Sequence, residues 1–324
     1  MPAMYGPDVT FLGVPRADLA NAASYAEADA VIIGAPFDGG TSHRPGARFG
    51  PSAIRSTDYL SHDGSRPHLA LGVDPLKDLR VVDVGDVNMP PGDSLAALTA
   101  LENTVAAVAA SGAIPIILGG DHSIAWPDVT GVARHHGFGR VAVVHFDAHA
   151  DTGKIEHGSL YGHGTPMRRL IESGAARGDR FLQVGLRGYW PDAETLGWMH
   201  DQGMRSFEMA AITARGLDAV LDECFTLATD DCDGVFLSID VDVVDPGMAP
   251  GTGTPEPGGL TSRQLLDAVR RCGIELPVVG ADIVELAPPF DGPGEITAML
   301  ANRLVLEVLS GIAYRRFGSL RRHL

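Results

Sequence analysis

Short apolar runs alternate with amphipathic stretches along most of this sequence, and that alternation limits the folds that the chain can adopt. Continuous apolar runs of this length are typical of strands in a parallel sheet that is covered on both faces. The stretches between them have helical spacing; within 94–110, for example, Leu98, Leu101 and Val105 fall on one face. The sequence therefore predicts an α/β fold with a mostly parallel sheet. The predicted strands are 30–35, 79–84, 114–118, 141–145, 181–184, 204–207, 235–239 and 278–284.

No linker divides the sequence, so we expect a single domain over residues 1–324. Its core spans about 30–312, between an N-terminal extension (1–29) and a basic C-terminal tail (314–324). The tail carries four arginines and is expected to lie in solvent or to contact another subunit. Further helices are predicted at 214–228 and 295–312, and Thr261 with Gln264 forms a capping-box pattern for a helix that begins near Ser262.

Composition narrows the classes of partner. The chain has 41 acidic and 25 basic residues, a formal net charge of -16, which disfavours nucleic acid and anionic membranes as partners because both are negatively charged. Its three cysteines lack metal-type spacing and no signal peptide is visible, so we expect a reducing cytoplasm. The apolar runs are shorter than the roughly 20 residues that a membrane span requires.

Three short motifs carry the chemistry, and each follows one of the predicted strands. They are Gly-Gly-Asp-His-Ser (119–123), Asp-Ala-His-Ala-Asp (147–151) and Asp-Val-Asp (240–242). Functional groups of open α/β sheets collect beyond the carboxyl ends of the strands, and alternate residues of an extended backbone point to the same side. Four carboxylates and two imidazoles are therefore expected to converge on one site. These candidate metal ligands are His122, Asp147, His149, Asp151, Asp240 and Asp242.

This donor set is rich in carboxylates and has no thiolate, so it suits Mn²⁺ better than a cysteine-bound Zn²⁺, and it leaves Ni²⁺ and Co²⁺ open. Two divalent ions would balance the four aspartates, and a bridging hydroxide would leave the cluster slightly negative and suited to attack a cation. The alternative is structural, with carboxylates that cap helices and histidines in the core. It is costly because many carboxylates would be buried without cations.

Together with further motifs, these residues resemble the ureohydrolase family, which comprises arginases, agmatinases and related guanidino hydrolases. The resemblance covers about residues 30–312. It implies a three-layer α/β/α, arginase-like fold with an eight-stranded, mainly parallel sheet, and a homotrimer or homohexamer. It also implies two Mn²⁺ ions per subunit and hydrolysis of a guanidino group to an amine and urea. The further motifs are Gly-Ala-Arg-Phe-Gly-Pro (46–51), His-Gly-Thr (163–165), Ala-Pro-Gly-Thr-Gly-Thr-Pro (249–255) and Val-Glu-Leu-Ala-Pro (284–288).

The resemblance also implies roles for individual residues. Asp147 and Asp240 would bridge the two metal ions, and Asp151 would bind one of them and count among the catalytic residues. Glu285 would grip the guanidinium of the substrate, and His163 would carry protons. One ion would take His122, Asp147, Asp151 and Asp240, and the other would take Asp147, His149, Asp240 and Asp242.

The sequence leaves open which group the substrate carries at the end away from its guanidine, here called its tail. The segment after Asp151 lacks the Thr-Ser-Gly-Asn pattern that arginases typically have, which counts against arginine. Agmatine, cleaved to putrescine and urea in polyamine biosynthesis, is the first choice; Glu156 could meet its ammonium group, although Lys154 weakens that argument. The alternative is a guanidino acid such as 4-guanidinobutyrate, 3-guanidinopropionate or a proclavaminate-type substrate, whose carboxylate Arg168 or Arg169 could serve.

Two rival functions remain open. A deacetylase with the same fold would use a single zinc ion and lack the full set of six ligands. An inactive regulatory subunit would have lost ligands, whereas this chain keeps all six together with Glu285 and His163. Both rivals are therefore disfavoured by the same observation.

Several other residues near the motifs are expected to support the site. His145 is assigned to the core or to the layer around the metal ligands, and Asp121 to that same layer. Asp245 is expected to shape its loop, and Arg48 to support the rim of the site or a subunit contact. Packing roles are expected for the three tryptophans, Trp126, Trp190 and Trp198.

Overall fold

Eight parallel strands form one sheet in the computed structural model, which describes residues 4–59 and 67–321. Neighbouring strands follow the order β2-β1-β3-β8-β7-β4-β5-β6, and every pair of neighbours is parallel. The predicted α/β class is confirmed, and the sheet is parallel throughout rather than mainly parallel. The strands are β1 Ala30–Ala35, β2 Val81–Asp86, β3 Ile114–Gly119, β4 Val141–Phe146, β5 Phe181–Val184, β6 Arg205–Phe207, β7 Gly234–Asp240 and β8 Val278–Val284.

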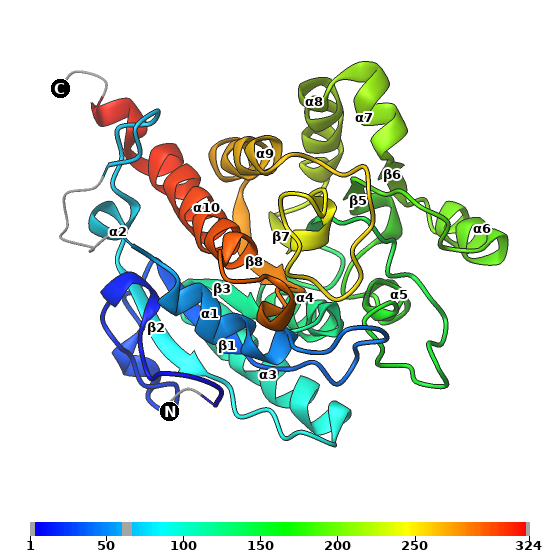
Figure 1. Cartoon of the computed structure of the whole chain (residues 1–324). Helices are drawn as coiled ribbons and strands as arrows, with labels where there is room; N and C mark the ends of the chain where they lie inside the picture. The colour runs from blue at the N-terminus through cyan, green and yellow to red at the C-terminus, as the bar shows by residue number, and fades with distance from the viewer. Residues whose placement is uncertain (1–3, 60–66, 322–324) are drawn as a thin grey trace.

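Helices cover both faces of the sheet and complete three layers (Figure 1). Side chains alternate between the faces along each strand, so Ile32 of β1 belongs to the core cluster that includes residues of α1, α8, α9 and α10. Val31 and Ile33 belong to the cluster that includes residues of α3, α4 and α5. The buried, continuously apolar strands follow from this double cover. The helices are α1 Gly50–Ser56, α2 Pro75–Asp78, α3 Ser94–Ala110, α4 Ala125–His136, α5 Pro166–Glu172, α6 Ala193–Asp201, α7 Met209–Arg215, α8 Leu217–Ala228, α9 Ser262–Glu275 and α10 Ile296–Arg321.

Two predicted helices differ from the structure. The segment 214–228 is divided between α7 and α8, because Gly216 between them has a φ of 85° that ends the first helix. The helix predicted at 295–312 continues to Arg321, so residues 314–321 are helical rather than a tail. Arg315 donates to the carbonyl oxygens of Ile274 and Glu275 at the end of α9. Arg322 lies outside the described residues. The capping box of Thr261 and Gln264 is confirmed.

Helix α10 also carries the one candidate membrane span among the described residues. Ile296–Gly318 is long and apolar enough by length and composition, with a mean hydropathy of 1.5, but 78% of that window is buried inside the chain. It packs on α9 and on β8 (Figure 1). Its apolar character is therefore accounted for by the core.

The strand order brings four central strands together as the support of the site. β3, β8, β7 and β4 are neighbours, although they come from distant parts of the sequence. Because all four run in one direction, their carboxyl ends meet at one edge of the sheet. Each of the polar motifs begins at one of these four ends.

Arg55 of α1 fixes one edge of the sheet through a buried ion-pair cluster. Its guanidinium donates to Asp83 at 2.9 and 3.0 Å and to Asp86 at 2.5 Å, both on β2. All three side chains are almost fully buried. The two carboxylates outweigh the effect of burial and raise the pKa of Arg55.

Replacement of Arg55 by Leu should lower the free energy of unfolding by about 3–5 kcal/mol, because it leaves two buried carboxylates without a cation. Urea denaturation measures this loss. The matched control is Arg134→Leu, which removes an exposed pair with Glu102 and should cost about 0–1 kcal/mol. Equal losses in the two variants would contradict the importance of the buried cluster.

Candidate metal centre and active site

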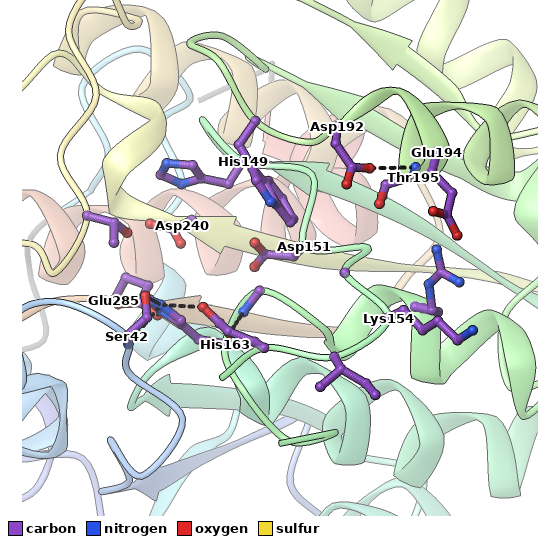
Figure 2. A pocket seen from close by; sticks show the side chains of 17 residues that line it. Ser42, His149, Asp151, Lys154, His163, Asp192, Glu194, Thr195, Asp240 and Glu285 are labelled. Atoms are coloured by element: carbon purple, nitrogen blue, oxygen red, sulfur yellow. Dashed lines mark hydrogen bonds and ion pairs between the residues drawn. The ribbon is translucent and has the colours of Figure 1, made fainter. Parts of the chain in front are cut away.

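The six predicted metal ligands lie together at the carboxyl ends of the central strands. His122 begins a short 3-10 helix (His122–Ile124) after β3, and Asp147, His149 and Asp151 follow β4. Asp240 ends β7, and Asp242 lies in the turn Val241–Val243 that follows. Figure 2 shows His149, Asp151 and Asp240 facing the same pocket. The convergence expected from the strand ends is therefore present; the catalytic and ligand roles themselves stay predictions.

The imidazole of His122 faces three carboxylates. Its Nδ1 lies 3.0 Å from Asp147 Oδ2, 3.0 Å from Asp151 Oδ2 and 3.1 Å from Asp240 Oδ2. The side chain is 1% exposed, and Nδ1 has no hydrogen-bond partner among the described residues. Burial lowers the pKa of His122, but these carboxylates raise it well above its usual value. One nitrogen and three oxygens around a common point form a suitable set of donors for a cation.

The other ring nitrogen of His122 is fixed by its neighbours. Its Nε2 lies 2.9 Å from Ser238 Oγ, which donates to Asp282 Oδ1 at 2.8 Å. Because the hydroxyl proton of Ser238 points to Asp282, the hydroxyl oxygen accepts from Nε2–H. In the neutral ring, Nδ1 therefore keeps a free lone pair directed at the three carboxylates, as metal binding requires.

A second group of donors shares Asp147 with the first. His149 Nδ1 lies 3.0 Å from Asp242 Oδ2 and 3.5 Å from Asp147 Oδ1. Asp147 thus uses one carboxylate oxygen in each group, as a bridging ligand would. Asp240 Oδ2 faces His122, while its Oδ1 accepts from the amide of Asp242 at 2.8 Å. The position of Asp147 between the two groups agrees with the bridging role that the resemblance implies. The bridging role of Asp240 stays a prediction, since one carboxylate oxygen can bind two ions.

The four aspartates are buried to an extent that calls for positive charge. Their exposed fractions are at most 5%. Burial and mutual repulsion raise the pKa of Asp151, Asp240 and Asp242, whereas contacts with His145 and His122 hold that of Asp147 well below its usual value despite burial. Carboxylates crowded in this way repel one another, and bound cations are needed to offset that repulsion. The donor set therefore fits two divalent ions, with the oxygen-rich character that Mn²⁺ prefers.

His145 lies within reach of the first group but acts as a support for Asp147. Its Nε2 lies 2.8 Å from Asp147 Oδ2, and its Nδ1 lies 3.1 Å from Gln183 Nε2. Gln183 donates through Nε2 because its Oε1 accepts from Ser206 Oγ. The proton of the neutral ring is therefore on Nε2, directed at Asp147, and neither nitrogen is free for a metal ion. This agrees with the expectation that His145 belongs to the layer around the ligands.

Glu285 and His163 form a contact beside the metal ligands. Glu285 follows β8 with a φ of 64°, a left-handed conformation that is strained for a non-glycine residue. Its Oε1 accepts from the amide of His122 at 2.8 Å and lies 2.8 Å from His163 Nδ1. Its Oε2 is buried and has no hydrogen-bond partner within the described chain. Glu285 therefore presents one free carboxylate oxygen in the pocket.

These residues line a pocket of about 490 Å³. Its inner end contains ligands from the metal groups together with Glu285 and His163. Its outer end is formed by the loop 153–164, by α5 and by the start of α6, and Figure 2 shows Lys154 and Glu194 there, away from the metal ligands. The pocket thus has a reacting end and a tail end. The charged residues of the tail end are Lys154, Glu156, Arg168, Asp192 and Glu194.

Three residues were proposed from the sequence to bind the tail of the substrate, and the structure shows which of them are available to it. Glu156 accepts from the amide of Gly164 at 2.8 Å, so it supports the loop that carries His163. Arg168 lines the pocket, is 7% exposed and stacks over Trp198 at 4.0 Å. Arg169 instead pairs with Glu172 and does not line the pocket. Arg168 is therefore the one of the two arginines that a substrate can reach.

Three further residues that the sequence assigned to supporting roles contact nearby loops rather than the metal ligands. Asp121 is buried and accepts from the amide of Gly40 at 2.7 Å, in the layer behind the site. Asp245 accepts from the amides of Gly247 and Gly258 and so shapes its loop, as expected. Arg48 pairs with Asp38.

A model of the arginase family matches residues 28–311 of this chain. The chain belongs to the arginase family. It is 40% identical over 283 residues to mitochondrial agmatinase of Gallus gallus, covering 87% of this chain and 80% of that protein. It is 38% identical over 293 residues to guanidinobutyrase of Pseudomonas aeruginosa, covering 89% and 88%. The solved structure of proclavaminate amidino hydrolase from Streptomyces clavuligerus matches with a TM-score of 0.85 and 36% identity, covering 96% of this chain and 99% of that one. This member of the arginase family is therefore a guanidino hydrolase.

Some pocket residues of this arginase-family chain were missed from the sequence. Ser42 and Glu194 come from segments without regular periodicity, and no sequence signal marks them. Thr254 lies in a motif that the sequence did single out, and its hydroxyl is 3.3 Å from Asp242. Trp190, assigned to packing, instead lines the pocket and is 43% exposed. The expected packing role therefore accounts for only part of its surroundings, because much of the residue is exposed at the pocket.

Replacement of His145 by Leu should weaken Mn²⁺ binding about 10–100-fold, because Asp147 loses the donor that orients it. Isothermal titration of metal-free protein measures the change. The control is His135→Leu, an exposed position at the end of α4 that should leave the affinity unchanged. An unchanged affinity in His145→Leu would contradict the supporting role.

Proposed function

We propose that this guanidino hydrolase binds two Mn²⁺ ions and hydrolyses agmatine to putrescine and urea, a step of polyamine biosynthesis. The observation that carries the guanidine end of this proposal is the free Oε2 of Glu285, a buried acceptor in the pocket that also holds Asp151 and Asp240. A buried carboxylate oxygen without a partner is costly. A planar cation that donates hydrogen bonds removes that cost, and a guanidinium has this geometry.

The metal ions would be held by the two donor groups. His122, Asp147, Asp151 and Asp240 would hold one ion, and His149 and Asp242 would hold the other together with the two bridging residues Asp147 and Asp240. When bound, two such ions lower the pKa of a water molecule and make it nucleophilic at neutral pH. The absence of thiolate from either group supports Mn²⁺ over structural Zn²⁺.

Glu285 would orient the substrate for attack. Its Oε1 is already occupied by the amide of His122 and by His163, so the free Oε2 is the atom that receives the guanidinium. Gly253 keeps this space open, because a Cβ there would lie 3.2 Å from Oε2. The guanidinium carbon would then face the metal ligands in a fixed orientation, which lowers the entropic part of the barrier.

His163 would give a proton to the departing amine. An amine leaves far more readily when it is protonated, and histidine is the side chain whose ordinary pKa suits proton exchange near neutral pH. His163 is 6% exposed and lies beside Glu285, at the end of the pocket where the carbon–nitrogen bond breaks.

Agmatine is supported by the acidic residues at the tail end. Glu194 is exposed and lines the pocket, and its carboxylate forms no hydrogen bond within the described chain, so it is available to an ammonium group. Asp192 is already engaged, since it accepts from the amide of Thr195 at 2.8 Å. An ammonium paired with an exposed carboxylate gains about 0.2–1 kcal/mol.

A guanidino acid is the second candidate, and Arg168 is the observation that favours it. This buried arginine donates through Nε to the carbonyl oxygen of Thr152, while its nearest carboxylate, that of Glu172, is 3.9 Å away. Burial lowers the pKa of Arg168, so a carboxylate partner would stabilise its charge. Lys154 at the same end of the pocket adds a second positive charge.

We also propose a cytoplasmic homotrimer or homohexamer without a nucleic-acid or membrane partner. All three cysteines are free, as a reducing compartment requires. The formal charge of -16 opposes association with nucleic acid or anionic lipid. Analytical ultracentrifugation gives the number of subunits directly.

Replacement of Asp240 by Ala should abolish urea release, because this carboxylate faces His122 at the centre of the first donor group. A chelator should inactivate the native enzyme, and Mn²⁺ should restore it. Urea assays and metal analysis of the purified protein measure both effects. Retained activity in the variant, or a single tightly bound zinc ion without activation by Mn²⁺, would exclude the two-manganese centre.

Assays of urea release from agmatine, 4-guanidinobutyrate, 3-guanidinopropionate and arginine identify the substrate, and with it the group at the end away from the guanidine. If the substrate is agmatine, Glu194→Gln should raise its KM about 1.5–5-fold. If a guanidino acid is the substrate, Arg168→Leu should raise its KM about 30-fold or more, since a buried charge loses its partner, and Arg168→Lys should recover part of the loss. Agmatine that is not cleaved while a guanidino acid is cleaved would reverse the first choice.

A further inference from the structure

We propose that Ser42 is the positioning and proton-relay residue of His163: its amide fixes the imidazole, and its hydroxyl connects the ring to the open pocket. This inference rests on the proposed function, because it concerns the proton that the departing amine receives. Ser42 lies in the loop between β1 and α1, and His163 in the loop before α5, so two distant segments meet at this contact (Figure 2).

The contact occupies the one ring nitrogen that Glu285 leaves free. His163 Nδ1 lies 2.8 Å from Glu285 Oε1, while Nε2 lies 2.6 Å from Ser42 Oγ and 3.1 Å from the Ser42 amide nitrogen. The two loops are also joined through the backbone, where the amide of His163 donates to the carbonyl oxygen of Gly40 at 2.9 Å. Ser42 is exposed and lines the pocket, whereas His163 is buried. Both residues line the pocket, so the hydroxyl lies beside the ring at the pocket wall and is the more exposed of the two groups.

The amide of Ser42 determines the tautomer of His163. A backbone N–H can only donate, so Nε2 acts as an acceptor toward it and the proton of the neutral ring lies on Nδ1, directed at Glu285. The hydroxyl differs from the amide because it can donate to Nε2 or, after rotation, accept from it. Ser42 therefore combines one group that fixes the ring with one that can pass a proton.

The amide also opposes the strong tendency of His163 to stay protonated. Burial lowers the pKa of His163, but Glu285 raises it to about 10, with smaller contributions from Asp121 and Asp151. Glu156 Oε1 lies 3.8 Å from Nε2. A proton on Nε2 would point at the Ser42 amide, and two donors that face each other repel. The amide therefore favours release of that proton.

The proton transfer is balanced when the hydroxyl acts as a relay. The charged ring gives its Nε2 proton to Ser42 Oγ, and the original hydroxyl proton passes to the nitrogen of the departing amine. The ring is left neutral with its proton on Nδ1, the hydroxyl is restored, and the amine leaves with one added proton. Water in the pocket recharges the ring along the same path in the reverse direction.

A purely structural role for Ser42 makes different predictions from a relay. A structural contact would hold the loop of His163, so its loss would disturb the ring whichever small residue replaced serine. A relay depends on the hydroxyl group, so Ser42→Thr should retain it and Ser42→Ala should lose it. Small proton carriers in solution should replace a missing relay and should not repair a displaced loop.

The first test measures urea release by the full-length enzyme with its metal ions. Ser42→Ala should lower kcat about 10–100-fold with little change in KM, and Ser42→Thr should recover most of the rate. The rate of Ser42→Ala should rise with added imidazole, whereas that of the native enzyme should not. The control is His43→Ala, an exposed neighbour outside the pocket, which should leave kcat unchanged. An unchanged rate in Ser42→Ala, or an imidazole-independent loss shared by Ser42→Thr, would overturn the proposal.

The second test does not depend on turnover and separates this inference from the proposed function. ¹⁵N NMR of labelled histidine, assigned with His163→Asn, should place the proton of the neutral ring on Nδ1 in the native enzyme and in Ser42→Ala, which keeps the amide. Exchange of the ring proton with water should be slower in Ser42→Ala. A neutral ring protonated on Nε2, or equal exchange rates, would refute the role of Ser42. Failure of the native enzyme to release urea from any guanidine would instead refute the proposed function.

Discussion

The repulsion among four buried aspartates is the constraint on which the rest of the site depends. Asp147, Asp151, Asp240 and Asp242 are almost completely removed from water, and such a cluster is stable only when cations and hydrogen-bond donors surround it. The nearby residues can be understood from that requirement. Histidine rings and backbone amides orient several of the carboxylate oxygens, and the parallel strands hold these groups at one edge. Bound cations would therefore stabilise the fold at this edge of the sheet as well as take part in the chemistry.

Much of the fold was predictable because buried parallel strands are continuously apolar. The bounds of β1, β5 and β8 agree with the predicted ones. β2 lies two residues further along because Asp83 and Asp86 are accommodated by Arg55, a long-range partner that no local pattern reveals. The order of the strands was not predictable either, since β8 and β7 lie between β3 and β4, which follow each other in the sequence.

The ligands were predictable for a different reason from the rest of the pocket. Asp147, His149 and Asp151 lie two residues apart just beyond β4, so a single strand end carries all three to the site, although Asp151 has a left-handed φ of 53° that no sequence pattern indicated. Ser42 and Arg168 meet the pocket only through contacts between distant loops, and their sequence surroundings are ordinary.

The division of the pocket between strand ends and loops has a consequence for how such chains diverge. The reacting end is built on four central strands, where a substitution disturbs the core, whereas the tail end is built on surface segments that tolerate change. Mutational drift can therefore alter which molecule enters without touching the groups that cleave it. Such drift would produce relatives with different substrates and a common reacting end. The relatives named agmatinase and guanidinobutyrase, which share about two fifths of their aligned residues with this chain, fit that expectation.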